Sequence, residues 1–178
     1  MQFEIFTDSP AQTQADCLVI GVHESGTVSA AGIAVDRQSG GKLSKFLKSG
    51  DFPGRLGETL LLPAFPRMKA SRLLLVGQGK TDVTRKAWRK ALQAAVSALA
   101  RTKCKSAAVA LSRPASRELD DYLFARSAAE ITHAALYRVN DLKSGKRPAA
   151  PELARIKFGP VRASSAASAR REIGRAHV

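Results

Sequence analysis

The sequence has no long apolar run, few cysteines and few aromatic residues, and these shortages exclude several classes of protein. No apolar stretch approaches the roughly 18 residues that a membrane-spanning helix needs. The N-terminus, Met1–Pro10, has no basic region followed by a long apolar one, so no signal peptide is predicted. We therefore expect a cytoplasmic protein without a membrane partner.

The chain contains two cysteines, Cys17 and Cys104, which are far apart in the sequence and outside any CxxC spacing. We interpret them as reduced, partly buried thiols, as is usual in a reducing compartment. A disulfide between them is the alternative.

Residues with the spacing of a catalytic or metal site are also missing. None of the histidines, His23, His133 and His177, has a second ligand three or four positions away, as a zinc site would require. We expect His23 and His133 to have structural roles, solvated or hydrogen-bonded. Asp120 and Asp121 point about 100° apart on a helix, so we interpret them as complementing its dipole. No catalytic residue, metal ligand or bound cofactor is predicted in this chain.

The composition is that of one globular domain, with 178 residues, 44% hydrophobic and 25% charged. The net charge of +14 is concentrated in two segments, residues 67–105 and residues 143–178. The first of them holds eleven basic residues and one acidic residue. Such a segment attracts polyanions.

Short apolar runs bounded by turn residues predict strands. Two of them, Thr59–Leu62 and Leu73–Val76, fit strands that are buried on both faces. After the second, Gly77–Lys80 indicates a tight turn that leads into a helix. The other predicted strands are Gln2–Phe6, Asp16–His23, Ser106–Leu111 and Leu153–Phe158.

Helical periodicity separates these strands. Ser29 is predicted to cap a short helix through Asp36, and a second short helix follows the Gly40-Gly41 break, with Leu43, Phe46 and Leu47 at helical spacing. Thr81 or Asp82 is predicted to cap a longer helix with an inner stripe of Trp88, Ala91, Leu92, Ala95 and Leu99. Ser116 is predicted to cap the last helix, with an inner face of Leu119, Leu123, Ala128, Ile131, Ala135 and Leu136. The alternation predicts an α/β fold with a mostly parallel sheet and helices on both faces.

Gly79-Lys80-Thr81 after a strand suggests a phosphate loop, but that loop needs a glycine five residues before Gly79, where Leu74 stands. We interpret the segment as a turn and helix cap. Free backbone amides at that helix N-terminus could still attract an anion.

The basic segment has few flat side chains, which argues against stacking on single-stranded nucleic acid. Duplex DNA needs only a stripe of cations, which Arg85, Lys86, Arg89 and Lys90 could provide. The alternative is that these four residues form an ordinary solvated helix face.

Three stretches together resemble one family. They are Asp16–Ser29 (DCLVIGVHESGTVS), Gly50–Pro63 (GDFPGRLGETLLLP) and Ser71–Lys80 (SRLLLVGQGK). Ala134–Lys146 and the ARIKF strand, residues 154–158, match the end of the same domain. The chain, over roughly residues 1–171, is similar to the N-terminal domain of the leucyl (cytosol) aminopeptidases, a family of metallopeptidases.

The resemblance implies a macro-domain-like, three-layer α/β/α sandwich with a mixed, mostly parallel sheet. It also implies a C-terminal catalytic domain that binds two divalent ions, zinc or manganese, releases N-terminal residues from peptides, and assembles as a homohexamer. The family's catalytic segments are not found here, so the chain alone is expected to be inactive. Some similar bacterial aminopeptidases also bind DNA. The fold analogy adds a third hypothesis, ADP-ribose binding, although the Asn-rich segment and triple-Gly loop of macro domains are absent.

We accordingly expect a domain over residues 1–160 and the start of a linker to a missing catalytic domain over 161–171. Residues 172–178, EIGRAHV, match what a common sequencing adaptor yields when translated in one frame, so we interpret them as an adaptor-derived tail on a truncated reading frame. A natural polar tail is the alternative.

Overall fold

Six strands form one sheet in the order β1-β6-β5-β2-β4-β3 in the computed structural model, which describes residues 1–114, 121–141 and 152–160. The central strand β2 (Cys17–His23) is buried along its whole length, and it pairs in parallel with β4 (Arg72–Gly79) and β5 (Ser106–Ala110). Further out, β6 (Arg155–Phe158) pairs in parallel with both β5 and β1 (Gln2–Ile5). The predicted mostly parallel sheet is confirmed.

The strand β3 (Thr59–Pro63) differs from its prediction. It lies at the edge of the sheet, antiparallel to β4, and exposed residues alternate with half-buried ones along it. Leu61 is 42% exposed. An uninterrupted apolar run therefore does not show that a strand is buried on both faces. Such a run also occurs here in an edge strand that is covered on one face only.

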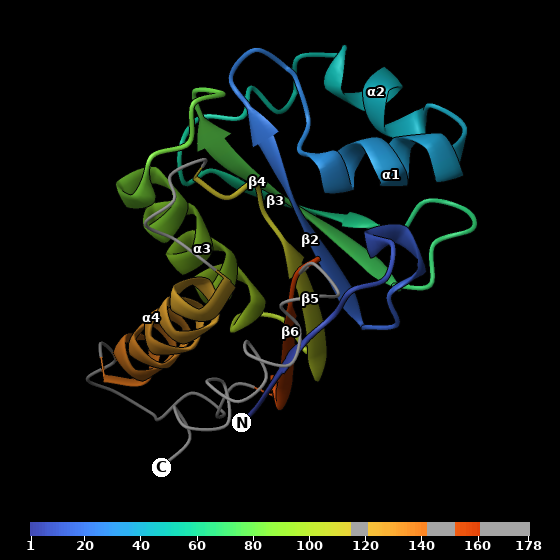
Figure 1. Cartoon of the computed structure of the whole chain (residues 1–178). Coiled ribbons are helices and arrows are strands. Elements are labelled where there is room, and N and C mark those ends of the chain that lie inside the picture. The colour runs from blue at the N-terminus through green and yellow to red at the C-terminus, as the bar shows by residue number, and fades with distance from the viewer. Residues whose placement is uncertain (115–120, 142–151, 161–178) are drawn as a thin grey trace.

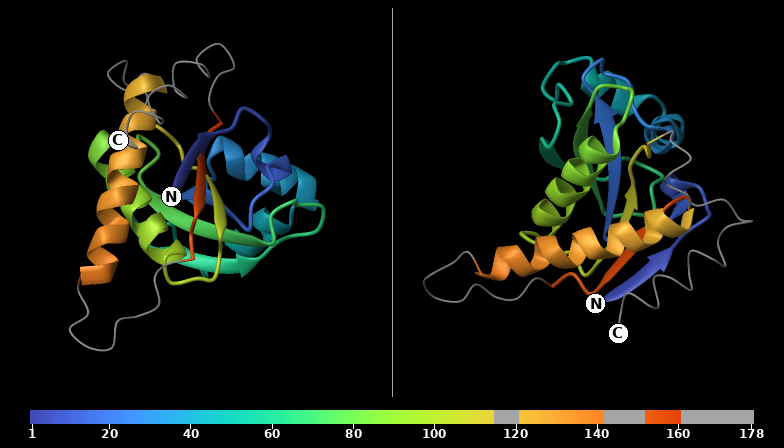
Figure 2. Two further views of the ribbon diagram at one scale, coloured as in Figure 1. Left: turned by 90° about the horizontal axis from the view of Figure 1, so that it is seen from below. Right: turned by 60° about the vertical axis from the view of Figure 1, so that its left-hand side comes forward.

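Helices cover both faces of the sheet and make three layers (Figure 1). On one side lie α1 (Ala30–Ser39) and α2 (Lys42–Leu47), and on the other lie α3 (Arg85–Leu99) and α4 (Asp121–Asp141). Figure 2 shows the two helical pairs on opposite sides of the strands. Each face has its own apolar cluster, so the predicted sandwich is confirmed.

Local polar contacts define the α1/α2 layer. The Ser29 hydroxyl accepts from the Gly32 amide at 3.2 Å and caps α1, as predicted, although the helix continues to Ser39. Gly40 ends it in the left-handed conformation, with φ 68°. The Asp36 carboxylate then accepts from the Ser44 amide at 2.8 Å and from the Ser44 hydroxyl at 2.6 Å, which fixes α2 against α1.

The α3/α4 layer is built on apolar periodicity. All five residues of the predicted α3 stripe are buried, but the cap is Thr84, whose hydroxyl accepts from the Ala87 amide at 3.1 Å, and not Thr81 or Asp82. In α4 the predicted inner residue Leu123 is 37% exposed, whereas Phe124 and Ala125 are buried.

Two local features complete the description. A short 3-10 helix, Pro10–Gln12, lies within the stretch Thr7–Gln14 that has loop composition. The predicted cap Ser116, the inner residue Leu119, Asp120 and the end of the chain lie outside the described residues. No helix in the described ranges is long and apolar enough to cross a bilayer.

Candidate functional site

The four cations proposed to contact polyanions lie in the first half of α3. This segment is helical because Thr84 caps it and because it contains neither glycine nor proline. Burial of Trp88 turns Arg85, Lys86, Arg89 and Lys90 to solvent, and all four are exposed. At about 100° per residue they span an arc of roughly 140°. They form one continuous face, which we call the α3 basic face.

The α3 basic face is electrostatically uncompensated within the described part of the chain, where none of its four residues has an ion pair. The single acid of the segment 67–105, Asp82, is itself exposed in the loop before the helix. The Lys90 side chain lies beside Gly57, where an added Cβ would meet Lys90 Cε at 3.4 Å. The charges are therefore available to an anionic partner.

A shallow groove of about 270 Å³ between α3 and α4 borders this face. Arg89 and Gln93 line one wall, and Glu130 and Ile131 line the other. The Glu130 carboxylate is paired with the Arg126 guanidinium at 2.9 Å on its own helix. The groove thus extends the α3 basic face toward a neutral, paired surface rather than toward more positive charge.

The chemistry of the α3 basic face suits a regular array of phosphates better than exposed bases. Trp88, the one tryptophan of the chain, is 1% exposed and contacts Phe124 at 5.3 Å between ring centroids. It is therefore unable to stack on a base, and base stacking is the usual basis of single-strand binding.

The Gly79-Lys80-Thr81 segment is not at a helix N-terminus. The strand β4 continues through Gly79, which has φ 71°, and α3 begins only at Arg85. The predicted tight turn into a helix is therefore a longer connection. The free helical amides that could attract an anion therefore lie at the start of α3, at Arg85, and not at Gly79-Lys80-Thr81.

The described histidines lie apart, and the described residues include no group of three or more histidine, cysteine or carboxylate side chains that could hold a metal ion. His133 is exposed and its ring lies 5.0 Å from that of Phe3. His23 is 6% exposed, so it is a buried histidine rather than a solvated one.

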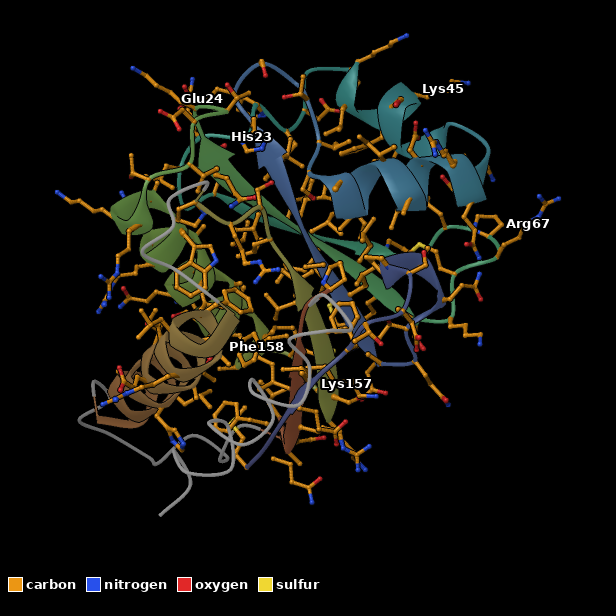
Figure 3. The ribbon with its side chains drawn as sticks, in the orientation of Figure 1. His23, Glu24, Lys45, Arg67, Lys157 and Phe158 are labelled. Atoms are coloured by element: carbon orange, nitrogen blue, oxygen red, sulfur yellow. The ribbon has the colours of Figure 1, made fainter. Side chains whose placement is uncertain are left out.

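A polar network at the carboxyl ends of the central strands, where Figure 3 labels His23, was missed by the sequence analysis. The fully buried Gln78 amide donates to the Ser112 carbonyl and accepts from the Ser112 amide, both at 2.9 Å. His23 Nε2 lies 3.4 Å from the Ser112 hydroxyl, and its Nδ1 has no partner among the described residues. A Cβ at Gly21 would lie 1.8 Å from the Gln78 oxygen. The available sequence signal was Gln78, a polar residue between Gly77 and Gly79 at the end of an apolar strand.

Beside this network, a pocket of about 200 Å³ lies at the N-terminus of α1. Its lining includes Ser29 and Ser112, together with Arg113 from the segment after β5 and Pro160 from the segment after β6. Arg113 donates to the Pro160 carbonyl at 3.2 Å and lies 4.5 Å from the centre of the Phe124 ring. In open α/β sheets, ligands commonly bind at such carboxyl ends.

Comparison with known proteins gives a consistent result. Residues 19–146 match the family described as "Cytosol aminopeptidase family, N-terminal domain". A relative named "Probable cytosol aminopeptidase", from Halorhodospira halophila, is 38% identical over 149 residues, which are 83% of this chain and 30% of the relative. The chain thus spans about a third of the length of the relatives that it matches.

Solved structures show the same fold. A mutant of tomato leucine aminopeptidase superposes with a TM-score of 0.70 and 22% identity, over 99% of this chain and 35% of that one. A Trypanosoma brucei macrodomain in complex with ADP superposes with a TM-score of 0.63 and 14% identity, over 97% of this chain and 69% of that one. The macro-domain-like architecture is therefore confirmed. From the match over residues 19–146 it follows that this chain belongs to the cytosol aminopeptidase family and corresponds to its N-terminal domain.

Proposed function

We propose that this chain is the non-catalytic N-terminal domain of a two-metal leucyl aminopeptidase that releases N-terminal amino acids from peptides in the cytoplasm. The observation that carries the proposal is the family match over residues 19–146, combined with coverage of only 30% of the matched relative. In this proposal two zinc or manganese ions are bound by a catalytic domain that follows in the polypeptide. When bound there, these ions would lower the pKa of a water molecule and polarise the scissile carbonyl.

The proposal assigns the domain to residues 1–160. The parent enzyme assembles as a homohexamer, and this domain's partner is the catalytic domain.

A chimera tests this function. Residues 1–160 replace the equivalent domain of the Halorhodospira halophila relative, and leucine anilide hydrolysis is measured with added manganese or zinc. We expect an active, hexameric chimera and no hydrolysis by the 178-residue chain under the same conditions. Hydrolysis by the chain alone would contradict the proposal, as would a chimera that folds but neither assembles nor turns over substrate.

A second candidate function, duplex DNA contact, is favoured by the α3 basic face. With up to four phosphates neutralised, the logarithm of the affinity should fall with the logarithm of salt concentration at a slope of about −3 to −4. Changing Arg85, Lys86, Arg89 and Lys90 to Gln should weaken binding at least tenfold and flatten that slope.

A matched control for the DNA experiment lies in the opposite layer. Arg37, Lys42, Lys45 and Lys48 are also exposed, and Figure 3 shows Lys45 on α2, away from the sheet. Changing these four to Gln removes the same total charge. Equal losses in the two quadruple variants would mean that net charge alone drives binding, and affinity independent of salt would exclude the candidate.

The third candidate, ADP-ribose binding, is favoured only by the pocket at the N-terminus of α1 and by the macrodomain likeness. Isothermal titration calorimetry with ADP-ribose tests it, with ADP and ribose 5-phosphate as the component ligands. Saturable heat that disappears on changing Arg113 to Ala would support this candidate, and the absence of heat would remove it.

A further inference from the structure

The two cysteines belong to the apolar cluster beneath the α3/α4 layer, with Cys17 at the start of β2 and Cys104 just before β5. Cys17 is 0% exposed and Cys104 is 1% exposed. Burial, followed by the charge of the neighbouring Cys104 sulfur, raises the pKa of Cys17 to about 12. The side chains that the sequence separates are therefore neighbours in the fold.

Hydrogen bonds of Asp16 join the start of β2 to the segment just before β5. The Asp16 carboxylate accepts from the Lys105 amide at 2.7 Å and from the Ser106 amide at 3.0 Å. The Asp16 amide donates to the Ser106 carbonyl at 3.2 Å. Since these bonds join the residue before Cys17 to the residues after Cys104, they bring the two cysteines to the same end of the sheet.

A cation distinguishes one sulfur from the other. Arg72 Nη1 donates to Cys104 Sγ at 3.0 Å, and this hydrogen bond raises the pKa of the guanidinium. Arg72 is placed there by sheet register, because it is the β4 partner of Cys17. A guanidinium donor stabilises the thiolate, which is the nucleophilic form of cysteine. Cys104 is therefore the better attacking group of the pair.

We propose that Cys17 and Cys104 form an intramolecular disulfide when a peroxide oxidises the chain. The Cys104 thiolate attacks the peroxide, the O–O bond breaks, and Cys104 becomes a sulfenic acid while hydroxide leaves and takes a proton to become water. The Cys17 sulfur then attacks Cys104, loses its proton, and releases the sulfenic oxygen as a second water. Two thiols are oxidised and one hydrogen peroxide is reduced to two waters.

The disulfide would connect the beginnings of two neighbouring parallel strands. Because the closed loop includes β2, both helices of the α1/α2 layer, β3, β4 and α3, it would strongly restrict the unfolded chain. The inference depends on neither a metal nor the α3 basic face, so it stands apart from the proposed function. It assigns an oxidative modification to two residues that otherwise fill the core.

The experiment treats the full 178-residue chain with hydrogen peroxide, quenches it, and measures intact mass and thiols under denaturing conditions. We expect a mass loss of about 2 Da, no titratable thiol, and a monomer on a non-reducing gel. The oxidised chain should unfold roughly 10 °C higher than the reduced one. Two free thiols, a covalent dimer, stable addition of oxygen, or a lower unfolding temperature would each overturn the proposal.

Single variants assign the two roles. Cys17→Ser should stop at a sulfenic acid on Cys104, which dimedone captures, whereas Cys104→Ser should not react at the same peroxide exposure. Arg72→Gln should slow disulfide formation at neutral pH about tenfold and shift its pH profile upward, and Arg72→Lys should recover part of the rate. Equal reactivity of the two cysteine variants, or an unchanged pH profile in Arg72→Gln, would contradict the assigned chemistry.

Discussion

The two helical layers of this domain are stabilised in different ways. The α3/α4 layer is long, follows clear apolar periodicity and buries aromatic rings, with Trp88 against Phe124 and Phe124 against Phe158. The α1/α2 layer is short and depends on caps and on the Asp36–Ser44 hydrogen bonds. We infer that one layer is specified by the volume of its core and the other by local backbone geometry.

The largest expected effect tests the role of core volume. Trp88→Ala removes a side chain that is 1% exposed and should lower the free energy of unfolding by about 4 kcal/mol. The matched change in the other layer, Leu43→Ala, removes a fully buried but smaller side chain and should cost about 3 kcal/mol. Urea unfolding followed by circular dichroism measures both. The comparison fails if Leu43→Ala is the more costly change.

The next effect tests backbone geometry in α1. An alanine in place of a helical glycine normally stabilises by about 1 kcal/mol. At Gly32, however, a Cβ would lie 2.6 Å from Val28 Cβ. Gly32→Ala should therefore destabilise the chain by about 2 kcal/mol through overpacking.

The neighbouring Ile33, which is 46% exposed, provides the control for Gly32. Ile33→Ala changes the same helix without entering the core, so its effect on the free energy of unfolding should stay within about 0.5 kcal/mol. If Gly32→Ala proves stabilising, the close approach of α1 to Val28 is not a constraint on this layer.

Alkaline pH should act through the α3/α4 layer, because the apolar cluster on that side contains both cysteines. Burial first, and the Cys104 charge second, raise the pKa of Cys17 from 9.0 to about 12. The folded state therefore keeps a proton that the unfolded state loses, so stability falls as pH rises from about 9 toward 12.

At pH 10 the loss from Cys17 relative to pH 8 should be about 1.4 kcal/mol. Cys17→Ala should lack this part of the decline, and the difference between the two unfolding curves under reducing conditions measures it. Parallel curves for the two proteins would show that Cys17 ionises in the folded state as it does in the unfolded one.

The difference between the layers also explains what the sequence could predict. The stripe from Trp88 to Leu99 repeats over several turns, so its buried face was predicted correctly. The cap of α3 was predicted at Thr81 or Asp82 instead of Thr84, because several polar residues precede the first turn and each has a side chain able to cap it. The edge position of β3 depends on pairing with β4, which local composition does not encode.

The same distinction between local periodicity and strand pairing applies to the candidate sites. The exposure of the four cations of the α3 basic face was predicted because helical periodicity alone places them off the buried stripe. The Gln78–Ser112–His23 network and the Cys17–Cys104–Arg72 cluster join residues from three different strands or strand ends. Their proximity depends on sheet order and register, which a single sequence does not reveal.

The smallest expected effects compare the caps of the two layers. Ser29→Ala removes a hydroxyl that is buried and leaves the Gly32 amide without its acceptor, so it should cost about 1 kcal/mol. Thr84→Ala removes an exposed capping hydroxyl. Water can then accept from the Ala87 amide, so the change should cost about 0.5 kcal/mol. Chemical denaturation of the two variants measures the difference. Because α1 depends on its cap more than α3 does, equal costs would mean that the two layers are specified alike.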